Sequence, residues 1–135
     1  MDALIIEATE NSPLISFETE SKIFEIVGES RPENVREFYE PILNWMDDYG
    51  TEMSANLNDE NNSTPITFNF KLEYFNSSSS KFILDIVKKI YDYHTKGIKI
   101  KVNWFFDEGD EDMQEAGEEL SKMVKFPFEY VEITE

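Results

Sequence analysis

Four consecutive serines, Ser77 to Ser80, form the segment of this chain best suited to chemistry. They follow Asn76 in the stretch Tyr74-Phe75-Asn76-Ser77-Ser78-Ser79-Ser80-Lys81-Phe82, where a strand pattern gives way to a helix pattern. The first turn of a helix presents unpaired N–H groups and the positive end of the macrodipole, so a phosphate on Ser77 would be stabilised there. Asn and Ser are also among the best N-cap residues. Local chemistry alone therefore favours a plain capping role.

The residues on either side of the serine run predict the elements that hold it. Before it, apolar side chains alternate with polar ones, which predicts a half-buried central strand with one face formed by Ile66, Phe68, Phe70, Leu72 and Tyr74. After it, apolar residues recur at helical spacing, at Phe82, Ile83, Ile86, Val87, Ile90 and Tyr93. We expect this helix to begin within residues 76–79 and to end near Gly97, which favours a left-handed cap.

The remaining elements follow from the same patterns. We expect strands at 14–17, 23–27, 98–104 and 126–133, with an additional strand at 4–7. The capping box Ser30-Arg31-Pro32-Glu33 predicts a helix with Ser30 as its N-cap, kinked or split at Pro41 and ended by Gly50. Residues 56–64 are polar and Asn-rich, as expected of an exposed loop. Residues 110–124 predict an acidic helix.

The order of these elements predicts one α/β domain over residues 1–135. Helices that alternate with strands require a mixed β-sheet flanked by helices, with right-handed crossovers between neighbouring strands. This element order resembles that of the STAS domain, the fold of anti-sigma-factor antagonists. In that fold a regulatory phosphoserine lies at the start of the helix that follows a central strand, and Ser77 falls at that joint.

Composition restricts the partners of this domain. A formal net charge of −17, from 29 acidic and 12 basic residues, repels nucleic acid and anionic membrane surfaces. The chain has no cysteine, so disulfides, thiol catalysis and thiolate metal sites are excluded. No segment approaches the ~20 apolar residues of a membrane span, and the first residues carry no basic targeting segment. We therefore expect a soluble, cytoplasmic protein.

Three segments together resemble the SiaC family of bacterial regulatory phosphoproteins over nearly the whole chain. They are residues 28–34, the serine stretch 74–82, and residues 102–107 followed by 112–119. Residue by residue, Asn76 matches the family's Asn and Ser77 its phosphorylated residue, a Thr in the best-known member. Ser78, Ser79 and Lys81 match the positions that follow. Ser80 lengthens the hydroxyl run, so a neighbouring serine remains an alternative acceptor.

The resemblance implies a function as well as a site. In the family, a SiaB-type kinase phosphorylates this segment and a PP2C-type phosphatase dephosphorylates it. The unphosphorylated protein binds and activates a SiaD-type diguanylate cyclase. On this basis the expectation for Ser77 changes from a plain cap to a phosphorylation site in a cyclic di-GMP signalling protein that uses no cofactor.

Other residues that could do chemistry point to simpler roles. His94 is the only histidine and lies near the expected end of a helix, where a partly charged imidazole is favourable. The acidic segment 107–112 does not fit the spacing of an EF-hand, so we interpret it as a solvated loop and helix start. Two alternatives stay open here: Glu115, Glu118 and Glu119 as a docking surface for a basic partner, and one exposed ring at Phe105 or Phe106 as a contact.

No glycine-rich phosphate loop, zinc pattern or nucleophile elbow occurs in the sequence. This favours a binding protein over an enzyme. Three classes remain: a phosphorylation-switched binding protein, an anti-sigma-factor-antagonist-like partner switch acting on transcription, and an enzyme whose site the sequence does not reveal.

Overall fold

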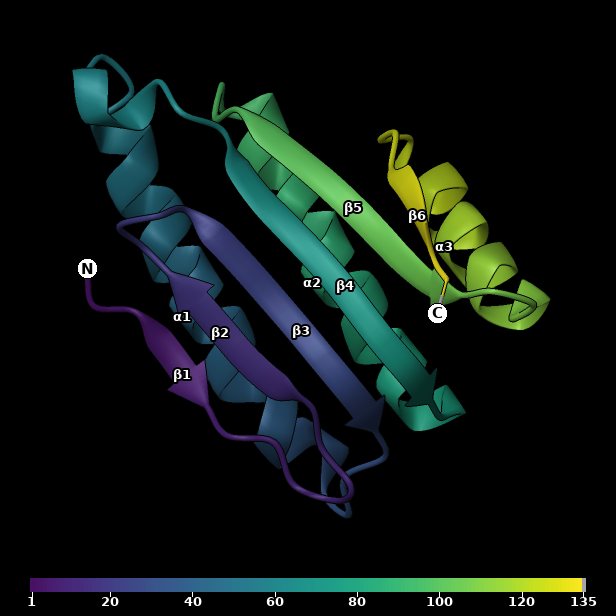
Figure 1. The fold of residues 1–135 in the computed structure, drawn as a ribbon. Coiled ribbons are helices and arrows are strands. Elements are labelled where there is room, and N and C mark those ends of the chain that lie inside the picture. Colours follow the sequence, from purple (N-terminus) through teal and green to yellow (C-terminus); the bar gives the residue numbers. More distant parts are fainter. Residues whose placement is uncertain (135) are drawn as a thin grey trace.

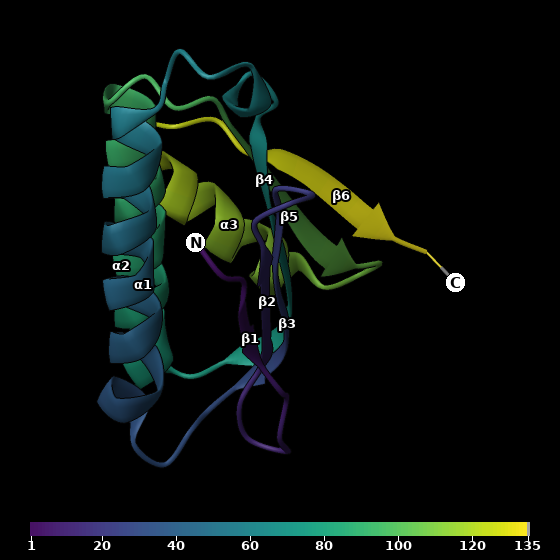
Figure 2. The same cartoon turned by 90° about the vertical axis from the view of Figure 1, so that its left-hand side faces the viewer.

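A six-stranded mixed sheet forms one layer of the protein, and helices cover one of its faces (Figure 1 and Figure 2). The computed structural model describes residues 1–134, apart from the side chain of Asn61. The strands follow chain order across the sheet: β1 (Leu4–Ile6), β2 (Leu14–Glu18), β3 (Ile23–Ser30), β4 (Ile66–Phe75), β5 (Ile100–Asp107) and β6 (Glu129–Ile133). The helices are α1 (Val35–Ala55), α2 (Ser77–Thr95) and α3 (Glu111–Val124), with a 3-10 turn η1 (Glu60–Asn62).

The sheet has an antiparallel half and a parallel half. β1, β2 and β3 form an antiparallel meander, whereas β3, β4, β5 and β6 are parallel neighbours. One helix connects each pair of neighbouring parallel strands by a right-handed crossover, as Figure 1 shows. The carboxyl ends of β3, β4 and β5 therefore meet the starts of α1, α2 and α3 at one edge of the sheet. The predicted mixed sheet and the central place of β4 are confirmed, and the likeness to STAS domains stays a prediction.

The hydrophobic core lies between the helices and the covered face of the sheet. Phe24 and Phe68 contact each other edge to face, with ring centroids 5.1 Å apart, and both are buried. Trp104 is also fully buried, and its Nε1 donates a hydrogen bond to the carbonyl of Met113 at 2.9 Å. The Tyr93 hydroxyl donates to the carbonyl of Met46, which links α2 to α1. Burial raises the pKa of Tyr93, so this hydroxyl stays protonated.

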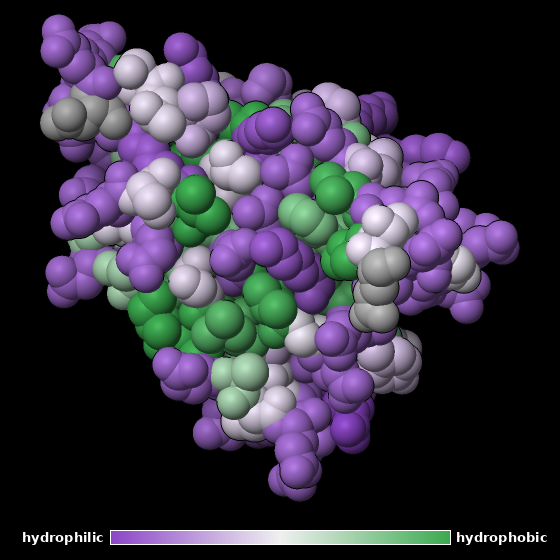
Figure 3. Space-filling view, in the orientation of Figure 1, coloured by the Kyte–Doolittle hydropathy of each residue, from purple (hydrophilic) through white to green (hydrophobic). Residues whose placement is uncertain are grey.

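The other face of the sheet is uncovered, although parallel strands are usually covered on both faces. Polar side chains pair across it: Asn103 Nδ2 donates to Asn69 Oδ1 at 2.9 Å, and Asn69 Nδ2 donates to Glu25 Oε2 at 3.3 Å. Lys71 Nζ lies 2.8 Å from the same carboxylate and 5.0 Å from the ring centre of Phe105. The hydrogen bond from Lys71 lowers the pKa of Glu25. Figure 3 shows hydrophilic residues separating several hydrophobic patches on this face.

Two predictions at the ends of the first helix are wrong. Ser30 is not a cap but the last residue of β3, and it is fully buried. The N-cap is Asn34, whose side chain accepts a hydrogen bond from Glu37 N at 3.1 Å. Gly50 does not end the helix but lies inside it. The ring of Tyr93 approaches the backbone at this point, and a Cβ on residue 50 would be 2.6 Å from Tyr93 Cε1. α1 also continues through Pro41 without being split.

The predicted apolar face of β4 is right up to Leu72 and wrong at Tyr74. The register between β3 and β4 shifts at Gly28 and Glu29, so that Leu72 pairs with Gly28 but Tyr74 pairs with Glu29. Such a bulge reverses the alternation. Tyr74 is therefore 49% exposed, and Phe75 packs partly against the core instead. The later elements agree with prediction, since α2 ends before Gly97, which has a φ of +91°, and α3 begins directly after Asp110.

Candidate functional site

The serine run forms the first turn of α2, directly after β4 ends. Asn76 is the N-cap, and its Oδ1 accepts a hydrogen bond from Ser79 N at 2.9 Å. Asn76 N in turn donates to the carbonyl of Ser30 at 3.1 Å, which fixes the turn against the end of β3. The chain changes from strand to helix here because a capping side chain replaces the sheet ladder as hydrogen-bond partner. The predicted start within residues 76–79 is confirmed.

The four serines have different environments. Ser77 and Ser78 are exposed at the helix start. Ser79 is fully buried, and its Oγ donates to the carbonyl of Ser30 at 3.0 Å. Ser80 is half-buried, and its Oγ donates to the carbonyl of Ser77 at 2.8 Å. The Ser77 and Ser78 side chains are therefore open to solvent in the folded protein, whereas Ser79 is held inside it.

Ser79 belongs to a buried hydroxyl cluster that comprises Ser30, Tyr39 and Ser79. Ser30 Oγ lies 2.5 Å from the Tyr39 hydroxyl and donates to Ser79 Oγ at 2.8 Å. Burial raises the pKa of Tyr39 to about 12, so its hydroxyl stays protonated. The cluster joins β3, α1 and α2, and it fixes the start of α2 by side-chain hydrogen bonds. Sequence reasoning assigned Ser30 to a cap, so it did not find this cluster.

The start of α2 is electrostatically unlike the other helix starts. α1 has Glu37 in its first turn and α3 has Glu111 and Asp112, whereas the first turn of α2 has no acidic residue. Two cations lie nearby instead: Lys81 Nζ and the Arg36 guanidinium are 5.6 Å and 5.8 Å from the ring centre of Phe82. The helix dipole and these cations favour a negative group at this position.

A phosphate on Ser77 would be stabilised both by the helix dipole and by a nearby cation. Lys81 lies four residues later, one helical turn along the same face. The free N–H groups of the first turn point towards the same region. Ser78 lies one helical turn before Phe82, and the Arg36 guanidinium lies over the ring of Phe82. The geometry therefore suits a phosphorylated hydroxyl at Ser77, with Ser78 as its exposed neighbour.

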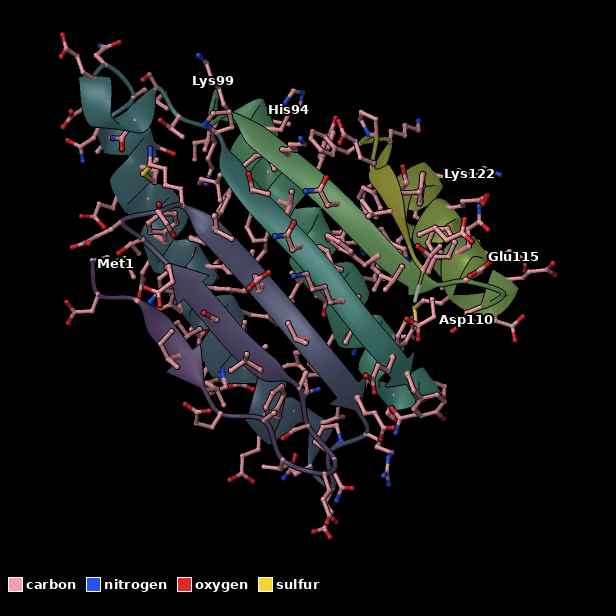
Figure 4. All side chains as sticks on the ribbon, in the orientation of Figure 1. Met1, His94, Lys99, Asp110, Glu115 and Lys122 are labelled. Atoms are coloured by element: carbon pink, nitrogen blue, oxygen red, sulfur yellow. The ribbon has the colours of Figure 1, made fainter. Side chains whose placement is uncertain are left out.

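The other candidates are not brought to this edge. Figure 4 shows His94 at the end of the sheet opposite to Asp110, and its ring contacts Phe126 at 5.2 Å between centroids. Asp110 caps α3 by accepting from Met113 N at 3.0 Å. Within residues 1–134 no group of three His, Cys, Asp or Glu could hold a metal ion, and no helix could cross a membrane. Of the adjacent rings, Phe106 is buried and Phe105 is half-buried beside Lys71.

The fold and this site define a class of small α/β proteins in which a serine-rich helix start lies at the carboxyl edge of a sheet covered on one face. The model of the SiaC family regulatory phosphoproteins matches residues 6–133, and the chain belongs to this family. An uncharacterized protein of Pseudomonas aeruginosa strain UCBPP-PA14 is 26% identical over 128 residues, which are 95% of this chain and 94% of that protein. The predicted resemblance to SiaC is thereby confirmed.

Two solved structures extend the comparison to three dimensions. The apo form of SiaC from Pseudomonas aeruginosa has a TM-score of 0.82 at 24% identity, covering 97% of this chain and 99% of that one. The structure of the diguanylate cyclase SiaD in complex with its activator SiaC, also from Pseudomonas aeruginosa, gives 0.83 at 25% identity. It covers 96% of this chain and 99% of that one. The fold described above is therefore the SiaC fold.

Proposed function

We propose that this protein binds and activates a diguanylate cyclase, and that phosphorylation of Ser77 stops the activation. The observation that carries the proposal is the whole-chain match to SiaC as it stands in complex with the cyclase SiaD. Membership of a family of regulatory phosphoproteins supports the second half, because it calls for a hydroxyl that a kinase can reach. Ser77 is such a hydroxyl, and it matches the acceptor implied by the family resemblance.

Phosphorylation would act on the partner more than on the fold. A phosphate adds about −1.5 to −2 charges and three strong acceptors. Within the protein, the helix N–H groups and Lys81 stabilise that charge. A partner that covers the start of α2 would have to desolvate the dianion, at a cost of several kcal/mol if no cation receives it. The complex therefore dissociates while the protein stays folded.

The protein acts by binding and not by turnover in this proposal. The buried hydroxyls of Ser30, Tyr39 and Ser79 are used for structure and do not reach a substrate. His94 lies at the other end of the sheet, away from the exposed serines. A SiaB-type kinase and a PP2C-type phosphatase would add and remove the phosphate. Such a kinase and a cyclase use nucleoside triphosphates, and we propose that the protein acts in the cytoplasm.

The test uses phosphoserine placed at residue 77 during translation, so that no kinase is needed. The purified protein is titrated into the SiaD-type cyclase of the same organism, and the synthesis of cyclic di-GMP from GTP is measured. The unmodified protein and Ser77→Ala should raise cyclase output, and the phosphoserine form should not. Phosphoserine at residue 78 is the matched control that tests the register of the site.

Two results would contradict the proposal. If the phosphoserine-77 form binds and activates the cyclase as well as the unmodified protein does, Ser77 is not the switch. If cellular cyclic di-GMP stays the same on deletion and on overexpression of the protein, the cyclase is not its target. The second result would leave an anti-sigma-factor-antagonist-like partner switch as the function.

A further inference from the structure

The residues at the start of α2 do not by themselves specify where the helix begins. Asn76 and the four serines that follow it are all good N-cap residues. Local capping would allow a start at Asn76, Ser77 or Ser78, and each start would place a different serine at the first helical position. In the structure the start is fixed, with Asn76 as the cap. A contact from elsewhere in the chain therefore selects it.

The carbonyl of Ser30, at the end of β3, provides this contact. It accepts one hydrogen bond from Asn76 N at 3.1 Å and a second from Ser79 Oγ at 3.0 Å. A carbonyl oxygen has two lone pairs, so both bonds are satisfied at once. A helix that began at Ser77 or Ser78 would open the turn between Asn76 and Ser79, and one oxygen could then no longer receive both donors. The Ser30 carbonyl thus favours the start at Asn76.

The buried hydroxyls of the cluster support this contact in a fixed order. A hydroxyl has one hydrogen to donate. Ser79 Oγ donates to the Ser30 carbonyl, and Ser30 Oγ donates to Ser79 Oγ at 2.8 Å. The Tyr39 hydroxyl, 2.5 Å from Ser30 Oγ, is therefore the donor of that pair. Its raised pKa, about 12, keeps the necessary proton in place. Tyr39 on α1 thus acts on the start of α2 through Ser30.

The position of Ser79 also determines the direction of Ser77. Successive helical residues are rotated by about 100°, so Ser77 lies roughly 200° from Ser79 round the helix axis and Ser78 about 100°. Ser77 is therefore directed away from the cluster. Ser78 lies to one side of it, one turn before Phe82, whose ring is 5.8 Å from the Arg36 guanidinium. The start at Asn76 makes Ser77 the most outward of the four hydroxyls.

We infer that the cluster of Ser30, Tyr39 and Ser79 determines which serine is phosphorylated, by holding α2 in the start that presents Ser77. The inference rests on the proposed function, because it needs a kinase that acts on this run. Ser30 and Tyr39 are positioning residues, since each acts through Ser79 and neither receives the phosphate. Without the cluster the start of α2 moves among several caps, and Ser78 is presented as well as Ser77.

The reaction is an ordinary phosphoryl transfer from a nucleoside triphosphate. A bond forms between the serine Oγ and the γ-phosphorus, and the bond from that phosphorus to the bridging oxygen of the nucleoside diphosphate breaks. The hydroxyl proton passes to a base of the kinase or to water. The cluster takes no part in these steps, so it should change the position of the phosphate and not the chemistry of the transfer.

The test incubates the intact protein with the SiaB-type kinase of the same organism and ATP, and mass spectrometry of the peptides gives the ratio of phosphate on Ser77 to phosphate on Ser78. The wild type should carry its phosphate on Ser77. One net hydrogen bond corresponds to a factor of about five in an equilibrium constant, so Tyr39→Phe should lower the ratio about fivefold. This variant keeps the ring that stacks on Phe82. Ser30→Ala removes two hydrogen bonds and should lower the ratio further.

Tyr93→Phe is the matched control. The Tyr93 hydroxyl is also buried and also joins α2 to α1, because it donates to the carbonyl of Met46, but it lies near the other end of α2. Its loss should leave the ratio unchanged. Hydrogen exchange of the Ser79 amide, which donates to Asn76 Oδ1, follows the start of α2 without a kinase. We expect exchange about tenfold faster in Tyr39→Phe and Ser30→Ala and unchanged in Tyr93→Phe.

Circular dichroism checks that each variant is folded, and Tyr39→Phe alone decides the test if Ser30→Ala does not fold. An unchanged ratio in the folded variants would overturn the inference and leave the proposed function standing. A ratio that falls equally in Tyr93→Phe would also overturn it, because general destabilisation would then be the cause. A wild-type protein that accepts phosphate on no serine of the run would overturn the proposed switch, and the role of the cluster with it.

Discussion

The helices α2 and α3 begin at the same edge of the sheet, each just after a parallel strand. Each is capped by a side chain that accepts a hydrogen bond from the N–H three residues later. The α3 start is negatively charged, with Asp110, Glu111 and Asp112, whereas the α2 start has a neutral Asn cap and no acid in its first turn. Negative charge stabilises a helix start, so the start of α3 has this stabilisation and the start of α2 lacks it. In a chain of net charge −17, this difference marks α2 as the start where an added charge has the largest effect.

Both starts are also tied to the sheet by buried hydrogen bonds. α2 is held by Ser79, which bonds to Ser30, and α3 by Met113, whose carbonyl accepts from Trp104. These anchors restrict what each start tolerates. At α2 the exposed Ser77 and the buried Ser79 are two residues apart, so the same substitution should have opposite effects at the two positions.

The largest expected effect is that of Ser79→Asp. It places a carboxylate where Ser79 is fully buried and in contact with Ser30, so we expect a loss of about 3–5 kcal/mol in the free energy of unfolding. Urea denaturation at pH 7 measures it, and Ser79→Ala is the control for loss of the hydroxyl alone, at about 1–3 kcal/mol. If Ser79→Asp were as stable as the wild type, the hydroxyl cluster would not be the anchor of α2.

The anchor of α3 should respond to Gly117→Ala. A Cβ there would lie 2.5 Å from Trp104 Cδ1, and the indole cannot move away because it is fully buried. We expect a loss of about 1–3 kcal/mol from overpacking, measured by thermal unfolding together with the near-ultraviolet circular dichroism of the tryptophans. Glu118→Ala changes the next position without adding an atom beside Trp104 and should stay within about 0.5 kcal/mol. Equal stability of the two variants would contradict the close packing of α3 on β5.

The two caps should differ in their response to salt. Asn76→Ala and Asp110→Ala each remove the acceptor of one N–H group, so each should cost about 1 kcal/mol. Asp110→Ala also removes a charge that complements the helix dipole, so its cost should be larger at low salt and fall as salt is added. Urea denaturation of both variants at low and high salt is the measurement. A salt-dependent cost for Asn76→Ala alone would reverse the comparison.

The smallest expected effect is a gain from Ser77→Asp. A carboxylate at the uncharged start of α2 should stabilise the protein by about 0.3–1 kcal/mol, whereas the neutral control Ser77→Asn should not. The helix dipole lowers the pKa of this carboxyl in the folded state. The gain is therefore present above the unfolded value of ~3.9 and is lost as the pH falls through the folded value. Unfolding measured between pH 3 and 7 tests this, and a gain that persists in the acid range would show that charge is not its cause.

Local patterns in the sequence predicted the elements around the site, because strand alternation, helical spacing and capping depend on residues a few positions apart. They placed β4 and α2 and the joint between them at Asn76. They failed where a distant segment decides the outcome. Gly50 was predicted to end a helix, but it lies within α1, where the ring of Tyr93 leaves no room for a Cβ. Tyr74 was predicted to be buried, but a register shift opposite Gly28 and Glu29 turns it outward.

The sequence by itself determined that a run of hydroxyls follows Asn76 at a strand-to-helix joint in a very acidic SiaC-like chain. Only the tertiary structure decided which of those hydroxyls faces solvent. Ser79 is buried because Ser30, 49 residues away, provides its hydrogen bonds. The apolar hollow lined by Ser80, Leu84 and Leu120 likewise forms only because α3 packs beside α2. Hydrogen bonds to the nearby backbone can be predicted from neighbouring residues, whereas burial depends on chain segments that meet only in the folded protein.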